Sequence, residues 1–224
     1  MKINIIYEDN HLLVVEKPVN IPVQADHSGD MDILTILKQG IKIRYQKPGN
    51  VYLGLVHRLD RPVGGVMVFA KTSKAASRLS DSIRRGNFNR SYLAVTRGAP
   101  SQQSARLEHF LYKDQQKNIV HAVSSKHKQA KKAALTYEVL DKQNALGLLA
   151  VTLHTGRSHQ IRVQLAETGT PLYGDQKYGS KYNKPGQQIA LWAHRLGLEH
   201  PTTKEWLEFQ CLPPQHQPWQ YFTI

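Results

Sequence analysis

The segment at residues 56–65, VHRLDRPVGG, sets one acidic side chain between two basic ones. Asp60 is flanked by Arg58 and Arg61, and two glycines follow before an apolar run. A single positioned carboxylate can act as a nucleophile or a general base, and an aspartate with an ordinary pKa of about 3.9 is ionised at neutral pH. The same residues could equally form a surface turn with an internal ion pair, so this segment alone leaves both interpretations open.

A second segment, LHTGRSHQIR at residues 153–162, gathers ring nitrogens and guanidinium groups around a predicted helix start. The N-terminus of a helix attracts anions, because its first backbone N–H groups lack helical partners and the helix dipole adds positive charge there. Arg157, His159 and Arg162 would strengthen that attraction. An ordinary helix cap with solvated charges is the alternative interpretation.

Motifs of several other enzyme classes are missing from the sequence. It contains no G-x-x-x-x-G-K-[ST] phosphate loop, no G-x-G-x-x-G, no G-x-S-x-G and no H-x-E paired with P-C-x-x-C. His154 and His159 lie five residues apart across a predicted strand–helix turn, a spacing that does not suit zinc. We therefore expect no metal site.

The elements that must position these two segments are mostly strands. Apolar runs bounded by turn residues predict strands at 3–7, 12–16, 64–71, 90–97, 104–111, 117–123, 133–140, 147–154, 190–198 and 205–210. Helical spacing predicts helices at 31–45, at 73–85 with Ser73 as the cap, and at 158–168 with Ser158 as the N-cap and Gly169 at the C′ position. This pattern predicts an α+β fold with mostly antiparallel connections.

The composition favours a cytoplasmic protein with a polyanionic partner. Lys and Arg number 30 against 17 Asp and Glu, which gives a formal net charge of +13 and favours nucleic acid. Two basic runs, at 71–97 and 113–132, predict a surface that tracks RNA, with solvated surface charge as the alternative. Cys211 is the only cysteine, the start does not resemble a signal peptide, and no apolar stretch is long enough to span a membrane.

Four motifs in order along the chain resemble those of the RluA family of pseudouridine synthases. His57-Arg58-Leu59-Asp60 resembles the H-R-L-D motif of that family, and Arg90-Ser91-Tyr92 resembles its second motif, a basic residue closely followed by tyrosine. TGRSHQIR at 155–162 is similar to T-G-R-x-H-Q-I-R, and GDQKYG at 174–179 is similar to G-D-x-x-Y-G. The opening hairpin is also similar, so the likeness runs from about residue 5 to residue 210.

The resemblance implies a role for each site residue. Asp60 would be the catalytic carboxylate, acting as nucleophile or base while the glycosidic bond of a flipped-out uridine is broken. Arg162 would pair with Asp60, and Tyr92 would stack on the uracil and move a proton. Ile161 would pack on the other face of the base, and Arg58 would enter the vacated space in the RNA. The other side chains expected to bind RNA are His57, Arg157, His159, Lys131 and Lys132.

The resemblance also implies the pseudouridine synthase fold, a mostly antiparallel mixed sheet in two halves with flanking helices and a basic active-site cleft. Residues 1–224 would form a single catalytic domain and a monomer, without the S4 RNA-binding domain that many relatives carry first. The expected reaction is the isomerisation of specific uridines in structured ribosomal or transfer RNA. Because this reaction has no redox step and no group transfer, no cofactor and no metal is expected.

The sequence departs from the family pattern at Val63 and Gly64, where the family has Thr-Ser before the glycine that corresponds to Gly65. Two hydroxyls that could brace the catalytic loop are absent, which predicts a change in loop stiffness or substrate choice rather than in reaction class. One alternative function is an RNA-binding factor that has lost catalysis. Another is a basic DNA-binding protein, although no helix-turn-helix or zinc-finger signature is present.

Overall fold

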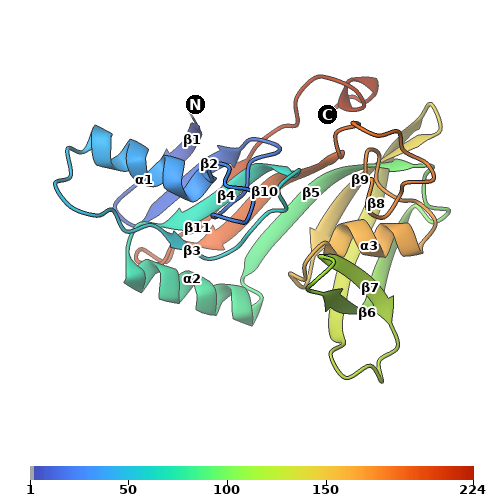
Figure 1. The fold of residues 1–224 in the computed structure, drawn as a ribbon, viewed down its shortest axis with the longest axis horizontal. Helices are drawn as coiled ribbons and strands as arrows, with labels where there is room; N and C mark the ends of the chain where they lie inside the picture. The colour runs from blue at the N-terminus through green and yellow to red at the C-terminus, as the bar shows by residue number, and fades with distance from the viewer. Residues whose placement is uncertain (1–2) are drawn as a thin grey trace. The chain divides into compact units, whose positions relative to one another are not determined.

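The computed structural model describes residues 3–224, which fall into two compact units. The first unit comprises the chain up to Arg90 together with Ala193–Cys211, and the second comprises Ser91–Trp192 and Leu212–Ile224. Figure 1 follows the chain through its helices and strands. A single catalytic domain over residues 1–224 stays a prediction.

Strands of the first unit pair in an order that differs from their order in the sequence. Its strands are β1 (Asn4–Glu8), β2 (Leu12–Lys17), β3 (Gly54–Leu55), β4 (Gly64–Ala70), β10 (Leu191–Glu199, whose first two residues belong to the second unit) and β11 (Trp206–Gln210). The order is β1-β2-β4-β10, with β3 on β4 and β11 on β10. β4 is buried along its whole length, which explains its unbroken apolar run.

Two helices cover the first unit, α1 (Ile33–Arg44) and α2 (Ser73–Arg85). α2 packs against β3 and β4 (Figure 1). The prediction that Ser73 caps this helix is wrong by one residue, because the side chain of Thr72 accepts the hydrogen bond from the backbone N–H of Ala75. Thr72 keeps an extended backbone, whereas Ser73 is already helical.

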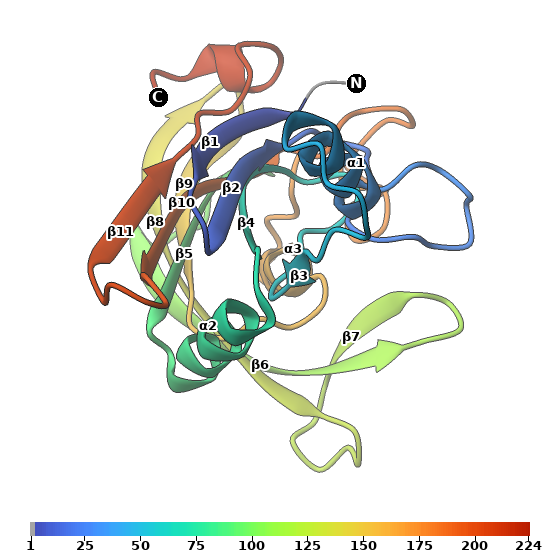
Figure 2. The same cartoon turned by 90° about the vertical axis from the view of Figure 1, so that its left-hand side faces the viewer.

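The second unit is an antiparallel meander with one strand inserted out of order. Its strands are β5 (Phe88–Arg97, which begins in the first unit), β6 (Ser104–Asp114), β7 (Ile119–Val123), β8 (Lys131–Gln143) and β9 (Leu146–Leu153). They pair in the order β5-β9-β8-β6-β7, all antiparallel. In Figure 2 the far end of the β6–β7 hairpin reaches away from β5 and β9, while β6 stays paired with β8.

Helix α3 (Gln160–Glu167) packs against β6 and β7 in the second unit. The prediction of Ser158 as its N-cap is wrong, because the helix begins two residues later. His159 occupies the N-cap position with a left-handed backbone, φ 50° and ψ 21°, and makes no side-chain cap. Gly169 is confirmed at the C′ position, where its φ of 80° suits glycine.

The predicted α+β pattern with antiparallel pairing is confirmed, and each predicted strand occurs with ends shifted by a few residues. β3 and the short 3₁₀ helix Trp219–Tyr221 were not predicted. Within residues 3–224, no helix combines the length and apolar character needed to cross a membrane.

Candidate active site

Asp60 lies on the loop between β3 and β4, in the first unit. The residue is half-buried, and its neighbour Leu59 is buried in the core. The backbone carbonyl of Asp60 accepts a hydrogen bond from the N–H of Val63 at 3.0 Å, so residues 60–63 form a tight turn. The predicted carboxylate therefore stands at the first position of a turn anchored by an apolar residue.

Lys17, the last residue of β2, holds this turn through its buried ammonium group. Its Nζ donates hydrogen bonds to the carbonyl oxygens of Pro18 at 3.0 Å, Arg61 at 3.0 Å and Val63 at 2.8 Å. Burial lowers the pKa of Lys17 to about 7, while the Asp60 carboxylate acts in the opposite direction. One side chain thus fixes the backbone on both sides of Pro62 and, with it, the loop that carries Asp60.

The departure from the family pattern falls where this loop ends, at Val63, and at Gly64, the first residue of β4. Lys17 grips the loop through backbone carbonyls, and this contact does not depend on a hydroxyl at either position. Gly65, in contrast, is required by geometry. Its φ is 117°, and a Cβ there would lie 2.2 Å from the carbonyl oxygen of Ala193.

The first two residues of the H-R-L-D segment have different surroundings: the His57 ring is held by the fold, whereas Arg58 is exposed. His57 Nε2 accepts a hydrogen bond from the N–H of Val68 at 3.0 Å, and its ring lies edge-on to Phe88 at 5.4 Å. Burial, assisted by the charge of Arg90, lowers the pKa of His57 to about 3, so the ring is neutral and serves the packing of the unit. Arg58 is exposed. Contacts of both side chains with RNA stay predictions.

In the second unit, the T-G-R-x-H-Q motif is tied to β8 by its own side chains. The Thr155 hydroxyl accepts from the N–H of Ala134 at 2.9 Å and donates to Oε1 of Gln160 at 2.7 Å. Gln160 Nε2 donates to the carbonyl of Ala134 at 3.0 Å, and its Oε1 accepts from the N–H of Arg157 at 3.0 Å. The threonine and glutamine therefore fix the loop that enters α3.

Arg162 is 7% exposed and forms a bidentate ion pair with Asp175, which is 1% exposed. Nε and Nη2 of Arg162 donate to the two carboxylate oxygens, each at 2.8 Å. Oδ1 of Asp175 also accepts from the N–H groups of Lys177 at 2.9 Å and Tyr178 at 3.2 Å. The guanidinium carbon lies 5.2 Å from the centre of the Tyr178 ring, a cation–π contact.

The Tyr178 hydroxyl extends this network to a predicted RNA-binding residue. It accepts from the N–H of Val120 at 2.9 Å and is hydrogen-bonded to Nδ1 of His159 at 2.6 Å. Asp175 and Tyr178 were not predicted as site residues, although both belong to the quoted GDQKYG motif. The signal was available in the sequence, because a buried arginine needs a carboxylate partner.

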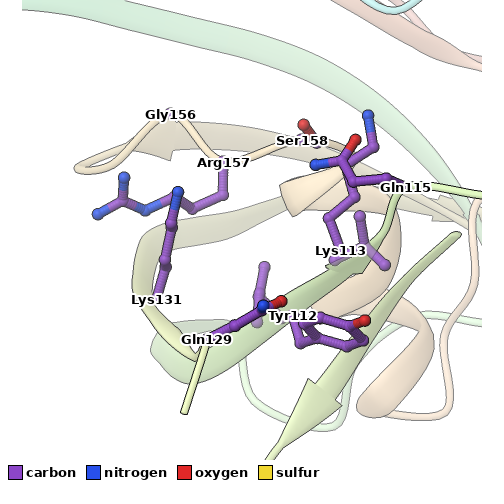
Figure 3. A pocket seen from close by; sticks show the side chains of 10 residues that line it. Tyr112, Lys113, Gln115, Gln129, Lys131, Gly156, Arg157 and Ser158 are labelled. Atoms are coloured by element: carbon purple, nitrogen blue, oxygen red, sulfur yellow. The ribbon is translucent and has the colours of Figure 1, made fainter. Parts of the chain in front are cut away.

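The remaining predicted residues also belong to the second unit. Ile161 is 4% exposed and Tyr92, on β5, is 7% exposed. Lys132 pairs with Glu108 at 2.9 Å. Lys131 and Arg157, by contrast, line a cavity of about 410 Å³ (Figure 3). Four of the predicted residues therefore lie on α3 or on the loop that leads into it: Arg157, His159, Ile161 and Arg162.

The model of the RNA pseudouridylate synthase family matches residues 11–167, well over half of the chain. The chain belongs to this family. The matched residues include Asp60, Tyr92 and Arg162, while Asp175 and Tyr178 lie beyond them. The resemblance to the RluA family is confirmed, and the protein is an RNA pseudouridine synthase.

Individual relatives agree with the family match. An RNA pseudouridine synthase of Aquifex aeolicus, named as uncharacterized, is 32% identical over 95% of this chain and 70% of its own length. Ribosomal large subunit pseudouridine synthase D of Haemophilus influenzae is 31% identical over 95% of this chain and 68% of its own length. The solved structure of human RNA pseudouridylate synthase domain containing 4 has a TM-score of 0.79 at 24% identity, covering 95% of this chain and 89% of that chain. The predicted pseudouridine synthase fold is confirmed.

Proposed function

We propose that the enzyme isomerises a specific uridine in structured ribosomal or transfer RNA, with Asp60 as the carboxylate that starts the reaction. The name of the Haemophilus influenzae relative favours a ribosomal substrate. The observation that carries the proposal is that the side chain of Lys17 is hydrogen-bonded to the backbone of the turn that contains Asp60. Three hydrogen bonds from one buried ammonium leave the turn little freedom, and a catalytic group on a fixed support does not have to be ordered during the reaction.

The reaction breaks the bond between N1 of uracil and C1′ of the ribose and forms a bond between C5 and C1′. The proton on C5 leaves, and N1 gains a proton, so no atom is lost. The Asp60 carboxylate would either attack C1′ or remove a proton from the ribose, and in both cases it is restored at the end. Tyr92, one wall of the base site in this proposal, would take part in the proton transfer from C5.

Arg162 would orient Asp60 by pairing with it. The grip of Asp175 supports this role, because it engages Nε and Nη2 of Arg162 and so fixes the direction in which Nη1 points. Asp175 also balances the charge of a guanidinium that is otherwise costly to bury. Ile161 would pack on the uracil face opposite Tyr92, and exposed Arg58 would fill the gap that the flipped base leaves in the RNA.

The test is Asp60→Asn, with Asp30→Asn as the matched control. Asp30 is an exposed acid of the same unit that pairs with Arg61. Purified variants are incubated with cellular RNA from cells lacking the enzyme, and pseudouridine is mapped by carbodiimide treatment and primer extension. We expect Asp60→Asn to lose activity by roughly 10²–10⁴-fold or more when it is assayed at a temperature where the variant is fully folded. Wild-type pseudouridine formation by Asp60→Asn would overturn the assignment of Asp60 as the carboxylate that starts the reaction.

A further inference from the structure

A cationic cavity lies in the second unit, between the β6–β7 hairpin and the loop that leads into α3. Its volume is about 410 Å³, within the range of roughly 300–1,000 Å³ that is usual for small-molecule sites. Lys131 and Arg157 lie on one side of it in Figure 3, while Lys113 and Gln115 lie on the other. Gly156 and Ser158 cross above, and Gln129 lies below.

The charge of this cavity has a single sign. No acidic side chain is among its lining residues. Within residues 3–224, no ion pair joins Lys113 or Lys131 to a carboxylate, whereas the neighbouring Lys132 pairs with Glu108. Two lysines and an arginine that surround one space repel one another, and an anion placed among them relieves that repulsion. The cavity is therefore suited to a phosphate-bearing ligand.

The buried apolar residues and the amide groups that line the cavity indicate that the ligand carries a base as well as a phosphate. Leu111 and Val120 line the cavity, and each is only 3% exposed, so the floor belongs to the core of the unit. The amides of Gln115 and Gln129 supply both donors and acceptors, which is what the edge of a nucleobase requires. An apolar floor, polar amides and three cations match the base and backbone of a nucleotide.

We propose that this cavity holds a nucleotide of the substrate RNA other than the target uridine, in a single-stranded stretch. The inference rests on the proposed function, because it takes RNA as the ligand. A single strand is required because a base within a duplex is stacked and cannot enter a concave site. Lys113, Lys131 and Arg157 would contact its phosphates.

The occupant would lie next to the network around Arg162. Val120, on the floor, donates its N–H to the Tyr178 hydroxyl, and Tyr178 is bonded to His159. Arg157, in the wall, is tied to Gln160 at the first residue of α3. A nucleotide in the cavity therefore touches the loop that leads into α3, the helix that carries Arg162, which would couple RNA recognition outside the target site to the position of that helix.

The test compares Lys113→Gln/Lys131→Gln with the control Lys142→Gln/Lys181→Gln, which removes the same charge from exposed lysines of the same unit outside the cavity. Binding of a fluorescent single-stranded RNA of about 12 nucleotides is measured across a salt titration. Each lost phosphate contact should reduce the slope of log K against log salt by about 0.7, so the cavity variant should lose about 1.4. When the salt is raised from about 50 to 200 mM, the cavity variant should therefore lose roughly sevenfold less affinity than the control variant does. Equal slopes in the two variants would overturn the inference.

Photocrosslinking supplies the second measurement. The same RNA carrying 4-thiouridine should crosslink to peptides containing residues 111–115, 129–131 or 156–158, and crosslinks only elsewhere would refute the site. A duplex of the same sequence should lose less affinity in the cavity variant than the single strand does, and an equal loss would refute the single-strand assignment. All binding is measured in an Asp60→Asn background, so these results do not depend on catalysis. An active Asp60→Asn enzyme would overturn the proposed function and leave the cavity result standing.

Discussion

Replacing Asp175 by asparagine tests whether the buried ion pair holds Arg162 for catalysis. Oδ1 of Asp175 accepts from Arg162, Lys177 and Tyr178, and an asparagine oxygen in that place keeps these three contacts. Oδ2 accepts from Nε of Arg162 and would become an NH₂ group that faces another donor. The change therefore removes one hydrogen bond and the neutralising charge while it leaves the local turn intact.

The magnitude follows from burial. Breaking a buried ion pair by removing one partner costs about 3–5 kcal/mol, because the other charge remains buried without compensation. Since the introduced asparagine retains an acceptor for Arg162, we expect the lower end, about 3 kcal/mol of unfolding free energy. For a chain of this size that is a fall in melting temperature of roughly 6–12 °C. The control Asp141→Asn, an acid of the same unit whose partners are its neighbours Lys142 and Gln143, should stay within about 0.5 kcal/mol.

Urea denaturation and pseudouridine formation, measured below the melting temperature of the variant, separate stability from chemistry. Asp175→Asn should lose at least tenfold in kcat/KM, or about 1.4 kcal/mol of transition-state stabilisation, even where it is fully folded. Adding Arg162→Met removes the buried guanidinium that Asp175 no longer neutralises, so the double variant should be more stable than the sum of the two single losses, by roughly 0.5–3 kcal/mol. The double variant should be inactive in pseudouridine formation, although it is more stable than expected from the single variants. A stable and fully active Asp175→Asn enzyme would refute the reasoning.

Two further predictions concern the H-R-L-D segment. The pKa of His57 falls from 6.5 to about 3 through burial and then through Arg90, so its contribution to stability is complete above pH 6.5 and is lost as the pH falls toward 3. Between pH 6.5 and pH 3 the unfolding free energy should drop by up to about 1.4 kcal/mol per pH unit. The variant His57→Gln, which keeps an acceptor for Val68, should flatten this pH dependence when it is measured by urea denaturation. Identical pH dependence in the variant and the wild type would count against this prediction. Arg58→Ala should reduce kcat more than it weakens RNA binding, measured on one substrate RNA, because the side chain fills a space that exists only after base flipping. Equal losses in kcat and affinity would contradict that role.

Local rules predicted most elements, and they failed at two helix starts, for different reasons. Thr72 and Ser73 are both good helix caps, and the sequence does not show which of them keeps an extended backbone. Ser158 is likewise a better cap by type than His159, yet the helix begins at Gln160. There Gln160 is hydrogen-bonded to the carbonyl of Ala134, which lies far earlier in the chain, and such a contact between distant residues overrides local preference.

Lys17 shows why the support of Asp60 could not be predicted. Lysine is almost never fully buried, so a lysine at the end of a strand is expected to reach solvent. Its partners are the carbonyls of Pro18 and of two residues more than forty positions later in the chain. Backbone carbonyls carry no signature in the sequence. Only the fold, which places the end of β2 beside the turn before β4, creates this contact.

Asp175 is the opposite case, because chemistry could have assigned it a role. If Arg162 is a buried site residue, a carboxylate must neutralise it, and an acid in a predominantly apolar stretch is the natural candidate. Asp175 follows Pro171-Leu172-Tyr173-Gly174, a stretch whose residues are all buried in the structure. Gly174 has a φ of 76°, and a Cβ there would lie 2.1 Å from the carbonyl of Gln188, so the glycine lets the chain turn the aspartate inward. The G-D-x-x-Y-G motif is thus explained as the support of Arg162: the glycine permits the turn, the aspartate binds the guanidinium, and the Tyr178 ring packs against it.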